Sequence, residues 1–301
     1  MQLSLVIPCR DKEDSKLKEL LRSIEAQDFP KEELEILVIT EGTSESAKAI
    51  GIRRAKGEVI GILASDNELV EKDTLSYAYE SVKEFGSVSP LRYFYKSDDD
   101  ILNRYFSLIG GNDPLSFYMR KNDRFSYFED YGIPPNNRMR TGLSWGDNGF
   151  FTYRHLLLKT DLDNYYHVDN ANEIDWIKKY GCQTMSRYIW HKTGGNIFSF
   201  FRKRYRYGLQ HAFNPNRRWH LVDFSKPKDI VRLTWFIIAS ITLVNPLYTA
   251  LRGYLKIQDK AWFLHPVCCL ATVITYAILM MHLGLRKMSL LPSAPTVAQK
   301  A

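Results

Sequence analysis

Cysteine is scarce in this sequence, and the features of a secreted protein are absent. The four cysteines, Cys9, Cys182, Cys268 and Cys269, show no spacing typical of a disulfide framework, and the last two are adjacent in an apolar run. A reducing compartment is the simpler interpretation. The first eight residues lack the basic region and the long apolar region of a signal peptide, so we expect them to form a strand.

Acidic residues are rare between residues 202 and 232. This stretch has nine Lys or Arg residues against two acids, Asp223 and Asp229, and the difference equals the formal net charge of the whole chain, +7. A general nucleic-acid binder more often spreads its basic residues over the fold or carries them on a recognisable motif. The sequence has no such motif, so we expect no nucleic-acid partner.

Apolar runs alternate with helical patterns over the first 85 residues. Helical spacing predicts helices over residues 15–27, 46–55 and 73–85. Between them, apolar runs predict strands at Leu3–Ile7, Leu34–Ile39 and Val59–Leu63. Strand, helix and strand in this order are typical of an α/β fold with a mostly parallel sheet.

The run Val59–Leu63 leads directly into a short acidic cluster that contains Asp66 and Glu68. In open α/β sheets, ligands bind outside the carboxyl ends of the strands. Carboxylates at that position suit a divalent cation that holds phosphates, since hard cations prefer oxygen ligands. The alternative is a solvated turn at the end of a strand.

Two apolar stretches without charge lie near the C-terminus, Leu233–Leu251 and Ala261–Leu285. Each is about 19 residues or longer, which is close to the thickness of a bilayer core. They predict a transmembrane hairpin, with a kink at Asn245-Pro246; the alternative is a buried hairpin in a soluble core. The dense basic block precedes the first stretch, so the positive-inside rule places the N-terminal domain in the cytoplasm.

The segment 197–213, just before this pair, is basic and aromatic at helical spacing. Such a helix suits a membrane interface, although a solvated surface helix has the same pattern. We therefore predict four parts: a domain at 1–196, an amphipathic interfacial segment at 197–228, the hairpin at 229–287 and a disordered tail at 288–301. Residues 87–144 are irregular and aromatic, and we interpret them as an excursion that carries substrate-specific loops.

Five blocks in the first seventy residues resemble family 2 glycosyltransferases, which have the nucleotide-sugar-binding GT-A (Rossmann-like) fold. The blocks are residues 5–13, 20–27, 35–43, 51–58 and 65–67. Two later segments are similar to the family more loosely: Trp145–Phe150 resembles the segment near the acceptor, and Val168–Gly181 resembles the segment of an acidic pair and a helix. The resemblance implies an inverting, hexosyltransferase-type enzyme that uses a nucleotide-sugar donor and a divalent cation, Mg or Mn.

The resemblance also implies roles for individual residues. The donor-binding positions that it implies are Pro8, Cys9, Asp11, Glu13, Glu41, Lys48 and Asp66, and Asp66 is also the implied metal ligand. Asp169 occupies the position of the catalytic base, with Glu173 and Asp175 as alternatives. Asn148 and Gly149 lie in the block near the acceptor, and Arg202 and Arg206 are weaker candidates for contact with a phosphate.

The sequence departs from the family at the metal motif, because Ala64 stands where the first Asp is expected. Asn67 or Glu68 could compensate in part. We therefore carry two hypotheses. The first is a membrane-anchored glycosyltransferase that moves a sugar to a lipid-linked acceptor, either a polyprenyl phosphate or a lipid-linked saccharide, with a possible homo-oligomer. The second is a catalytically impaired, membrane-tethered subunit that binds nucleotide-sugar or serves as a scaffold.

Overall fold

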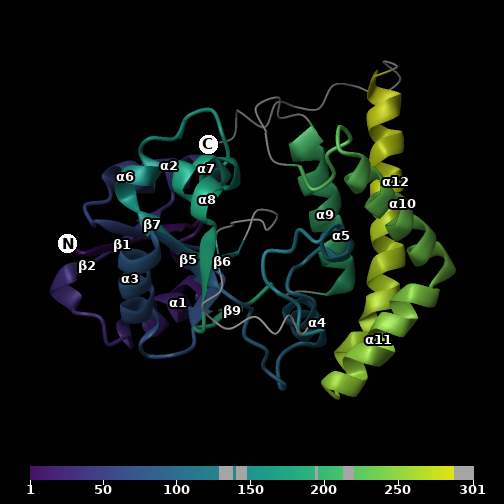
Figure 1. Ribbon diagram of the computed structural model, residues 1–301, viewed down its shortest axis with the longest axis horizontal. Coiled ribbons are helices and arrows are strands. Elements are labelled where there is room, and N and C mark those ends of the chain that lie inside the picture. The colour runs from purple at the N-terminus through teal and green to yellow at the C-terminus, as the bar shows by residue number, and fades with distance from the viewer. Residues whose placement is uncertain (129–137, 140–147, 194–195, 213–219, 288–301) are drawn as a thin grey trace. The chain divides into compact units, whose positions relative to one another are not determined.

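The computed structural model describes residues 1–128, 138–139, 148–193, 196–212 and 220–287 (Figure 1). The chain forms two compact units. Unit 1 comprises Met1–Gly194 and Asn216–Leu221, and unit 2 comprises Gly195–Pro215 and Val222–Ala301. The predicted boundaries at residues 196, 228 and 287 stay predictions.

Unit 1 alternates strands and helices along most of its length. Its strands are β1 (Leu3–Pro8), β2 (Leu34–Ile39), β3 (Val59–Leu63), β4 (Asn67–Leu69), β5 (Ser87–Pro90), β6 (Arg138–Met139), β7 (Asn148–Tyr153), β8 (Cys182–Met185) and β9 (Ile189–His191). Its helices are α1 (Ser15–Glu25), η1 (Lys31–Glu33), α2 (Ser44–Arg54), α3 (Thr74–Phe85), α4 (Ile101–Ile109), α5 (Pro114–Met119), α6 (Arg154–Leu157), α7 (His167–Glu173) and α8 (Asp175–Tyr180).

The central sheet has seven strands in the order β2-β1-β3-β7-β5-β8-β6. Strands β2, β1 and β3 are parallel to one another, and β5 and β8 run in the same direction, while β7 and β6 run against them. The expectation of an α/β fold with a mostly parallel sheet is confirmed. A separate two-stranded sheet pairs β4 with β9 in antiparallel orientation.

Helices cover both faces of the central sheet. On one face, α1 and α3 pack against β1 and β3 through apolar side chains that include Leu17, Leu20 and Val82. On the other face, α2, α7 and α8 contribute Ile52, Ala171 and Ile177 to a second core. Both faces of the parallel strands are therefore buried, which explains why β1 and β3 are continuous apolar runs.

The sequence placed the elements after residue 85 less accurately. Between residues 182 and 191 the chain forms two strands, β8 in the central sheet and β9 in the small one, and the sequence analysis assigned neither. The irregular excursion contains β5, α4 and α5. Of the block at 145–150, residues 145–147 lie outside the described residues.

Unit 2 consists of helices. They are α9 (Ile197–Ala212), α10 (Pro227–Thr242), α11 (Val244–Lys256), η2 (Lys260–Phe263) and α12 (Leu264–Lys287). α12 packs against α9, α10 and α11. The predicted tail at 288–301 lies outside the described residues.

The structure matches part of the prediction of a transmembrane hairpin with a kink at Asn245-Pro246. Within the described ranges, one helical segment, Lys260–Leu285, is long and apolar enough to cross a membrane. The other apolar stretch is broken into α10 and α11, which are bent by 84°. The break is at Leu243, in a left-handed conformation with φ of 59°, and not at Asn245-Pro246. Pro246 explains the position, because its ring cannot continue the hydrogen-bond ladder of α10 but fits the first turn of a new helix.

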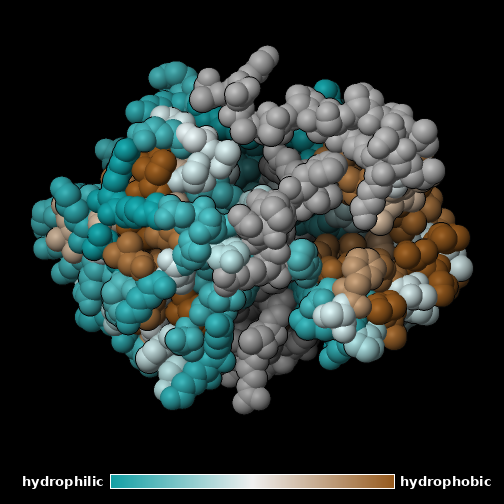
Figure 2. Space-filling view, turned by 90° about the horizontal axis from the view of Figure 1, so that it is seen from above, coloured by the Kyte–Doolittle hydropathy of each residue, from teal (hydrophilic) through white to brown (hydrophobic). Residues whose placement is uncertain are grey.

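Unit 2 exposes many large apolar side chains, which gather as a brown surface at the right of Figure 2. The most exposed ones on α10 and α11 are Val231, Ile241, Val244 and Leu255, with exposed fractions between 62% and 80%. On α12, Met280 and Met281 are more than 60% exposed. A soluble monomer rarely presents so much contiguous apolar surface.

Candidate active site

The candidate site lies at the carboxyl end of β3, where a tight turn follows the strand. The amide of Asn67 donates to the carbonyl of Ala64 at 3.0 Å, and the Asn67 side-chain Oδ1 accepts from the amide of Ala64 at 3.0 Å. These two bonds fix the turn on both sides. Asp66 lies at the tip of this turn, and its side chain is 22% exposed.

The small sheet brings β9 alongside this turn. In the β4–β9 ladder, Asn67 is the register partner of His191. The amide of Lys192 donates to the carbonyl of Asp66 at 2.8 Å, so the two backbones are fastened together. As a result, Nε2 of His191 lies 3.5 Å from Oδ1 of Asp66. The sequence offers no signal for this pairing.

The Asp66–His191 pair adjoins a buried chain of hydrogen bonds that runs through Tyr93, Asn148 and Asn67. The ring of Tyr93 lies against His191, with centroids 5.1 Å apart. The Tyr93 hydroxyl accepts from Nδ2 of Asn148 at 2.8 Å and donates to Asp123 at 3.2 Å. Oδ1 of Asn148 in turn accepts from Nδ2 of Asn67 at 2.9 Å. Burial raises the pKa of Tyr93 well above its ordinary value, and the Asp123 charge raises it further, so the hydroxyl stays protonated.

Asn148 and Gly149, predicted near an acceptor, therefore lie beside the Asp66 turn. Asn148 is 8% exposed and links Asn67 to Tyr93. Gly149 has φ of 85°, and a Cβ there would lie 2.1 Å from Cδ1 of Ile189 on β9. Glycine at this position lets β7 approach β9 closely, which helps to place His191.

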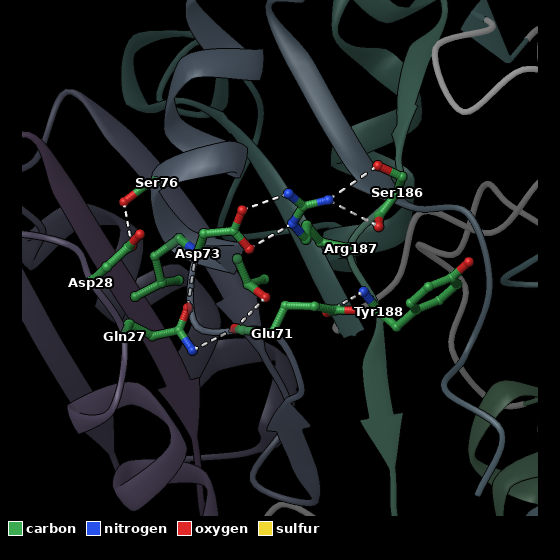
Figure 3. Close-up of polar contacts among 10 residues, drawn as sticks. Gln27, Asp28, Glu71, Asp73, Ser76, Ser186, Arg187 and Tyr188 are labelled. Atoms are coloured by element: carbon green, nitrogen blue, oxygen red, sulfur yellow. Dashed lines mark hydrogen bonds and ion pairs between the residues drawn. The ribbon is translucent and has the colours of Figure 1, made fainter.

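The start of β9 is anchored by the polar contacts in Figure 3. Arg187 donates to both carboxylate oxygens of Asp73, and the amide of Tyr188 donates to Glu71 at 2.9 Å. The pKa of Asp73 is held below its ordinary value, chiefly by the bond from Arg187. The loop between β4 and α3 thus holds the segment that leads into β9.

The end of β9 is anchored by Lys192. Its amine contacts Glu19 on α1 and Glu68 on β4. Burial lowers the pKa of Lys192, but its bonds to the two carboxylates outweigh this and leave the pKa above its ordinary value. Glu68 is engaged by Lys192 and Asn67 by the turn, while His191 faces Asp66. Compensation for Ala64 by Asn67 or Glu68 stays a prediction.

The pair Asp66 and His191 can supply two ligands to a divalent cation. A carboxylate oxygen and an imidazole nitrogen that face each other at 3.5 Å are suitable donors. Among the residues that the structure describes, no group of three or more His, Cys, Asp or Glu side chains is placed to hold a metal. A cation held by this pair would need its remaining ligands from other sources, such as phosphate oxygens and water.

The loop after β1 lies beside β3 at the same edge of the sheet, since the two strands are parallel neighbours. Pro8 ends β1, and the thiol of Cys9 donates to the carbonyl of Asp11 at 3.0 Å. The Asp11 carboxylate accepts from the amide of Glu13 at 2.9 Å, and Glu13 pairs with Lys18. Asp11 and Glu13 are exposed at the edge where donor binding was predicted.

Glu41 and Lys48 are each engaged by a neighbouring residue. Glu41 forms two bonds with Arg54, both 2.9 Å, and the bond from Arg54 lowers the pKa of Glu41. The side chain of Lys48 is 1% exposed, and its Nζ lies 2.5 Å from Oε1 of Glu45. The other carboxylate oxygen of Glu45 accepts from the amide of His167 at 2.8 Å. Lys48 thus belongs to a buried ion pair that joins α2 to α7, and a role toward a diphosphate stays a prediction.

Asp169 lies in the first turn of α7 and is 2% exposed. It packs on the face of the sheet that α2 and α8 cover. Its role as the base stays a prediction, and a reaction there needs the α7 region to admit the acceptor. Asp175 is fully exposed and near Lys178, as expected for a residue that solvates its helix. Arg202 and Arg206 are exposed on α9, in unit 2.

Comparison with known proteins gives a likeness of fold in outline. No family model and no curated protein matches the chain. Among solved structures, it is similar to the mannosyltransferase PcManGT from Pyrobaculum calidifontis in complex with GDP-Man and Mn2+, at 14% identity and a TM-score of 0.44, covering 91% of this chain and 86% of that one.

It is also similar to a fragment of TarS from S. aureus in complex with UDP-GlcNAc, at 15% identity and a TM-score of 0.38, covering 71% of this chain and 68% of that one. The same fragment in complex with UDP gives 13% identity, a TM-score of 0.40 and coverage of 100% and 95%. With TM-scores below 0.5, these likenesses assign no function to the chain.

Proposed function

We propose that this chain is a membrane-anchored, inverting glycosyltransferase that transfers a sugar from a nucleotide-diphosphate donor to a lipid-linked acceptor. The observation that carries the proposal is the pair of Asp66 and His191 at the carboxyl end of β3. It lies at the edge of a parallel sheet, where α/β folds bind ligands. The sequence of the first seventy residues resembles family 2 glycosyltransferases, and this resemblance suggests that the reaction at the pair is sugar transfer.

In this proposal the donor diphosphate lies over the β1 and β3 ends. Asp66 and His191 would hold a Mg or Mn ion, which offsets the charge that develops on the leaving diphosphate. Asp11 and Glu13 lie on the neighbouring loop, within the predicted nucleoside-binding region. The buried chain through Asn148 and Tyr93 keeps the His191 ring in place.

The transfer forms one bond and breaks one. An acceptor oxygen attacks the anomeric carbon from the face opposite the diphosphate, the bond from that carbon to the diphosphate oxygen breaks, and a nucleoside diphosphate leaves. A polyprenyl phosphate is already an anion and requires little base. A hydroxyl of a lipid-linked saccharide must lose its proton, and Asp169 is the residue proposed to take it.

The membrane part of the proposal rests on unit 2. The segment Lys260–Leu285 can cross a bilayer, and the bent pair α10 and α11 would form the second crossing. The basic residues that precede α10 favour a cytoplasmic location for unit 1. A lipid-linked acceptor suits an enzyme that is anchored in this way.

The second candidate is a membrane-tethered subunit that binds nucleotide-sugar without transferring it. Two observations favour it: Ala64 leaves the turn with one acid fewer than the family pattern, and Asp169 is 2% exposed. The two candidates differ in whether the chain transfers sugar from the bound donor.

The test is transfer of radiolabelled sugar from UDP-, GDP- and dTDP-sugars to organic-extractable lipid, in membranes that contain the full chain. We expect label in the lipid fraction with one donor in the presence of Mn2+, and none with Asp66→Ala. Donor binding without transfer to any lipid or to water would favour the subunit. If the chain neither binds a donor nor transfers sugar, both candidates are refuted.

A further inference from the structure

Strand β2 is the open edge of the central sheet in unit 1 (Figure 1). It pairs with β1 along its whole length, and among the described residues no strand lies on its other side. Ile36, in the middle of β2, is 41% exposed, and Leu34, Leu37 and Val38 are only partly buried. An exposed apolar edge is a template for pairing with another strand, and natural proteins usually cover or blunt it.

The hydrogen bonds of β2 show which of its backbone groups point outward. The carbonyl of Ile39 accepts from the amide of Cys9 at 2.9 Å, so Ile39 turns its backbone groups toward β1. Because the direction alternates along a strand, Leu34, Ile36 and Val38 turn theirs outward. The amide of Leu34 is used within the η1 turn. The carbonyl of Leu34 and both backbone groups of Ile36 and Val38 have no partner among the residues that the structure describes.

The devices that usually protect an exposed edge are absent from β2. Natural edge strands carry Lys or Pro, or a β-bulge that interrupts the ladder. β2 contains neither residue, and its register with β1 is regular from Leu34 to Ile39. Its one charged side chain, that of Glu35, accepts from the hydroxyl of Ser4 at 2.6 Å and from the amide of Lys56 at 2.8 Å. The outer side of β2 is therefore suited to bind another strand.

A second copy of β2 complements this edge when the two strands are antiparallel about a two-fold axis. The registers that turn the outward groups toward each other differ in which charges they bring together. One register places Glu35 opposite Glu35 of the second copy, and the next but one places Glu33 opposite Glu41. Like charges directly opposite each other are destabilising. The register between them is centred on Ile36 and, continued past the strand ends, brings Lys31 toward Glu41, which has the opposite charge.

We propose that β2 binds β2 of a second copy of this chain, with Ile36 opposite Ile36, so that the two central sheets form one continuous sheet. The amide and carbonyl of Ile36 then exchange hydrogen bonds with those of the second copy, and the amide of Val38 donates to the carbonyl of Leu34 across the interface. The two exposed Ile36 side chains meet on the same face and are removed from water. The proposal is independent of the proposed sugar transfer.

Assembly is tested on the full chain in detergent, by light scattering that separates the mass of the protein from that of the detergent. We expect twice 35.1 kDa for the unaltered chain and 35.1 kDa for Ile36→Lys, which places like charges opposite each other at the centre of the interface. Leu158→Lys is the matched control, because Leu158 is 40% exposed elsewhere in unit 1, and it should remain dimeric. A monomeric unaltered chain, or a dimer that persists in Ile36→Lys, would overturn the proposal.

The register is tested by a directed cross-link between two copies. Hydrogen-bonded partners in an antiparallel pair have Cα atoms about 5.5 Å apart, which is within the range of a disulfide. Mild oxidation should therefore link Ile36→Cys into a covalent dimer and leave Leu158→Cys unlinked, since the native cysteines are buried. A dimer held only by the helices of unit 2 would give no cross-link at residue 36, which contradicts the proposal. Neither assay uses a sugar donor, so their failure is distinct from failure of the transfer reaction.

Discussion

Nε2 of His191 lies 3.5 Å from Oδ1 of Asp66, although the two residues belong to distant parts of the chain. The β4–β9 ladder sets this distance, and bonds at both ends of β9 maintain it. In the proposed function, this pair is what allows a turn with Ala64 in place of an acid to bind a cation. Each of the following predictions tests a part of that account.

The first prediction concerns the ligand role of His191. In His191→Ala, the Mn2+ concentration for half-maximal stabilisation by the donor should rise at least about tenfold, because one of two protein ligands is lost. Thermal shift against Mn2+ at fixed donor measures it. The control is His155→Ala, which removes an exposed histidine on α6. An unchanged Mn2+ requirement in His191→Ala would show that this side chain is not a ligand.

The second prediction concerns the buried chain behind the site. Tyr93→Phe keeps the ring against His191 but leaves Asn148 and Asp123 without the hydroxyl. We expect the free energy of unfolding of unit 1 to fall by about 1–3 kcal/mol. Urea unfolding followed by tryptophan fluorescence measures it, with Tyr153→Phe as the partly buried control. A loss no larger than that of the control would mean that the buried chain of hydrogen bonds contributes little to the free energy of unfolding.

The third prediction concerns the close approach of β7 and β9. In Gly149→Ala, the new methyl group would meet Ile189 and the backbone would keep φ near 85°, which an L residue rarely adopts. We expect a loss of about 1–3 kcal/mol and a weaker Mn2+ response, since β9 must move. Gly111→Ala is the matched control, because a Cβ there meets its nearest neighbour at 3.4 Å. Equal stability and Mn2+ response in both variants would contradict this account.

The fourth prediction concerns the loss of thermal stability at low pH. The pKa of Asp73 is held below its ordinary value of 3.8 by Arg187, and that of Glu19 below its ordinary value of 4.5 by Lys192. A carboxyl group with a lowered pKa stabilises the fold above its unfolded pKa and loses this contribution as the pH falls through its folded pKa. The melting temperature should therefore fall as the pH drops below about 4.5 and through the lowered pKa values of these two groups.

The control for acid is Asp73→Asn, which cannot ionise. Over the same pH range its melting temperature should fall less than that of the unaltered protein, because one titrating group has been removed. If both proteins lose stability in parallel, the Asp73–Arg187 pair does not contribute to the acid response.

The sequence predicted the parts of the fold that local pattern determines. The runs at residues 3–7 and 59–63 are buried on both faces, and the run at 34–39 forms the partly exposed edge strand β2, so all three could be predicted as strands from their apolar residues alone. Asp66 could be identified as a site residue because it directly follows one of them. The same reasoning failed for β9, since three residues with mixed polarity carry no period.

His191 and Tyr93 could not be found from the sequence, because their roles depend on pairings between distant segments. The burial of Lys48 against Glu45 could not be predicted either, because it depends on how α2 packs, and the donor-binding role of Lys48 stays a prediction. The break at Leu243 was displaced by two residues from the predicted kink, because the structural effect of a proline falls on the turn before it.

The most direct measurement of the central claim is donor binding to the detergent-purified chain. Thermal shift monitors the binding of UDP-, GDP- and dTDP-sugars, with and without Mn2+. The account predicts a rise in melting temperature for one donor that requires Mn2+, is abolished in Asp66→Ala and is weakened in His191→Ala. A donor response that is independent of Mn2+ and unchanged in both variants would contradict the assignment of this pair as the metal and diphosphate site.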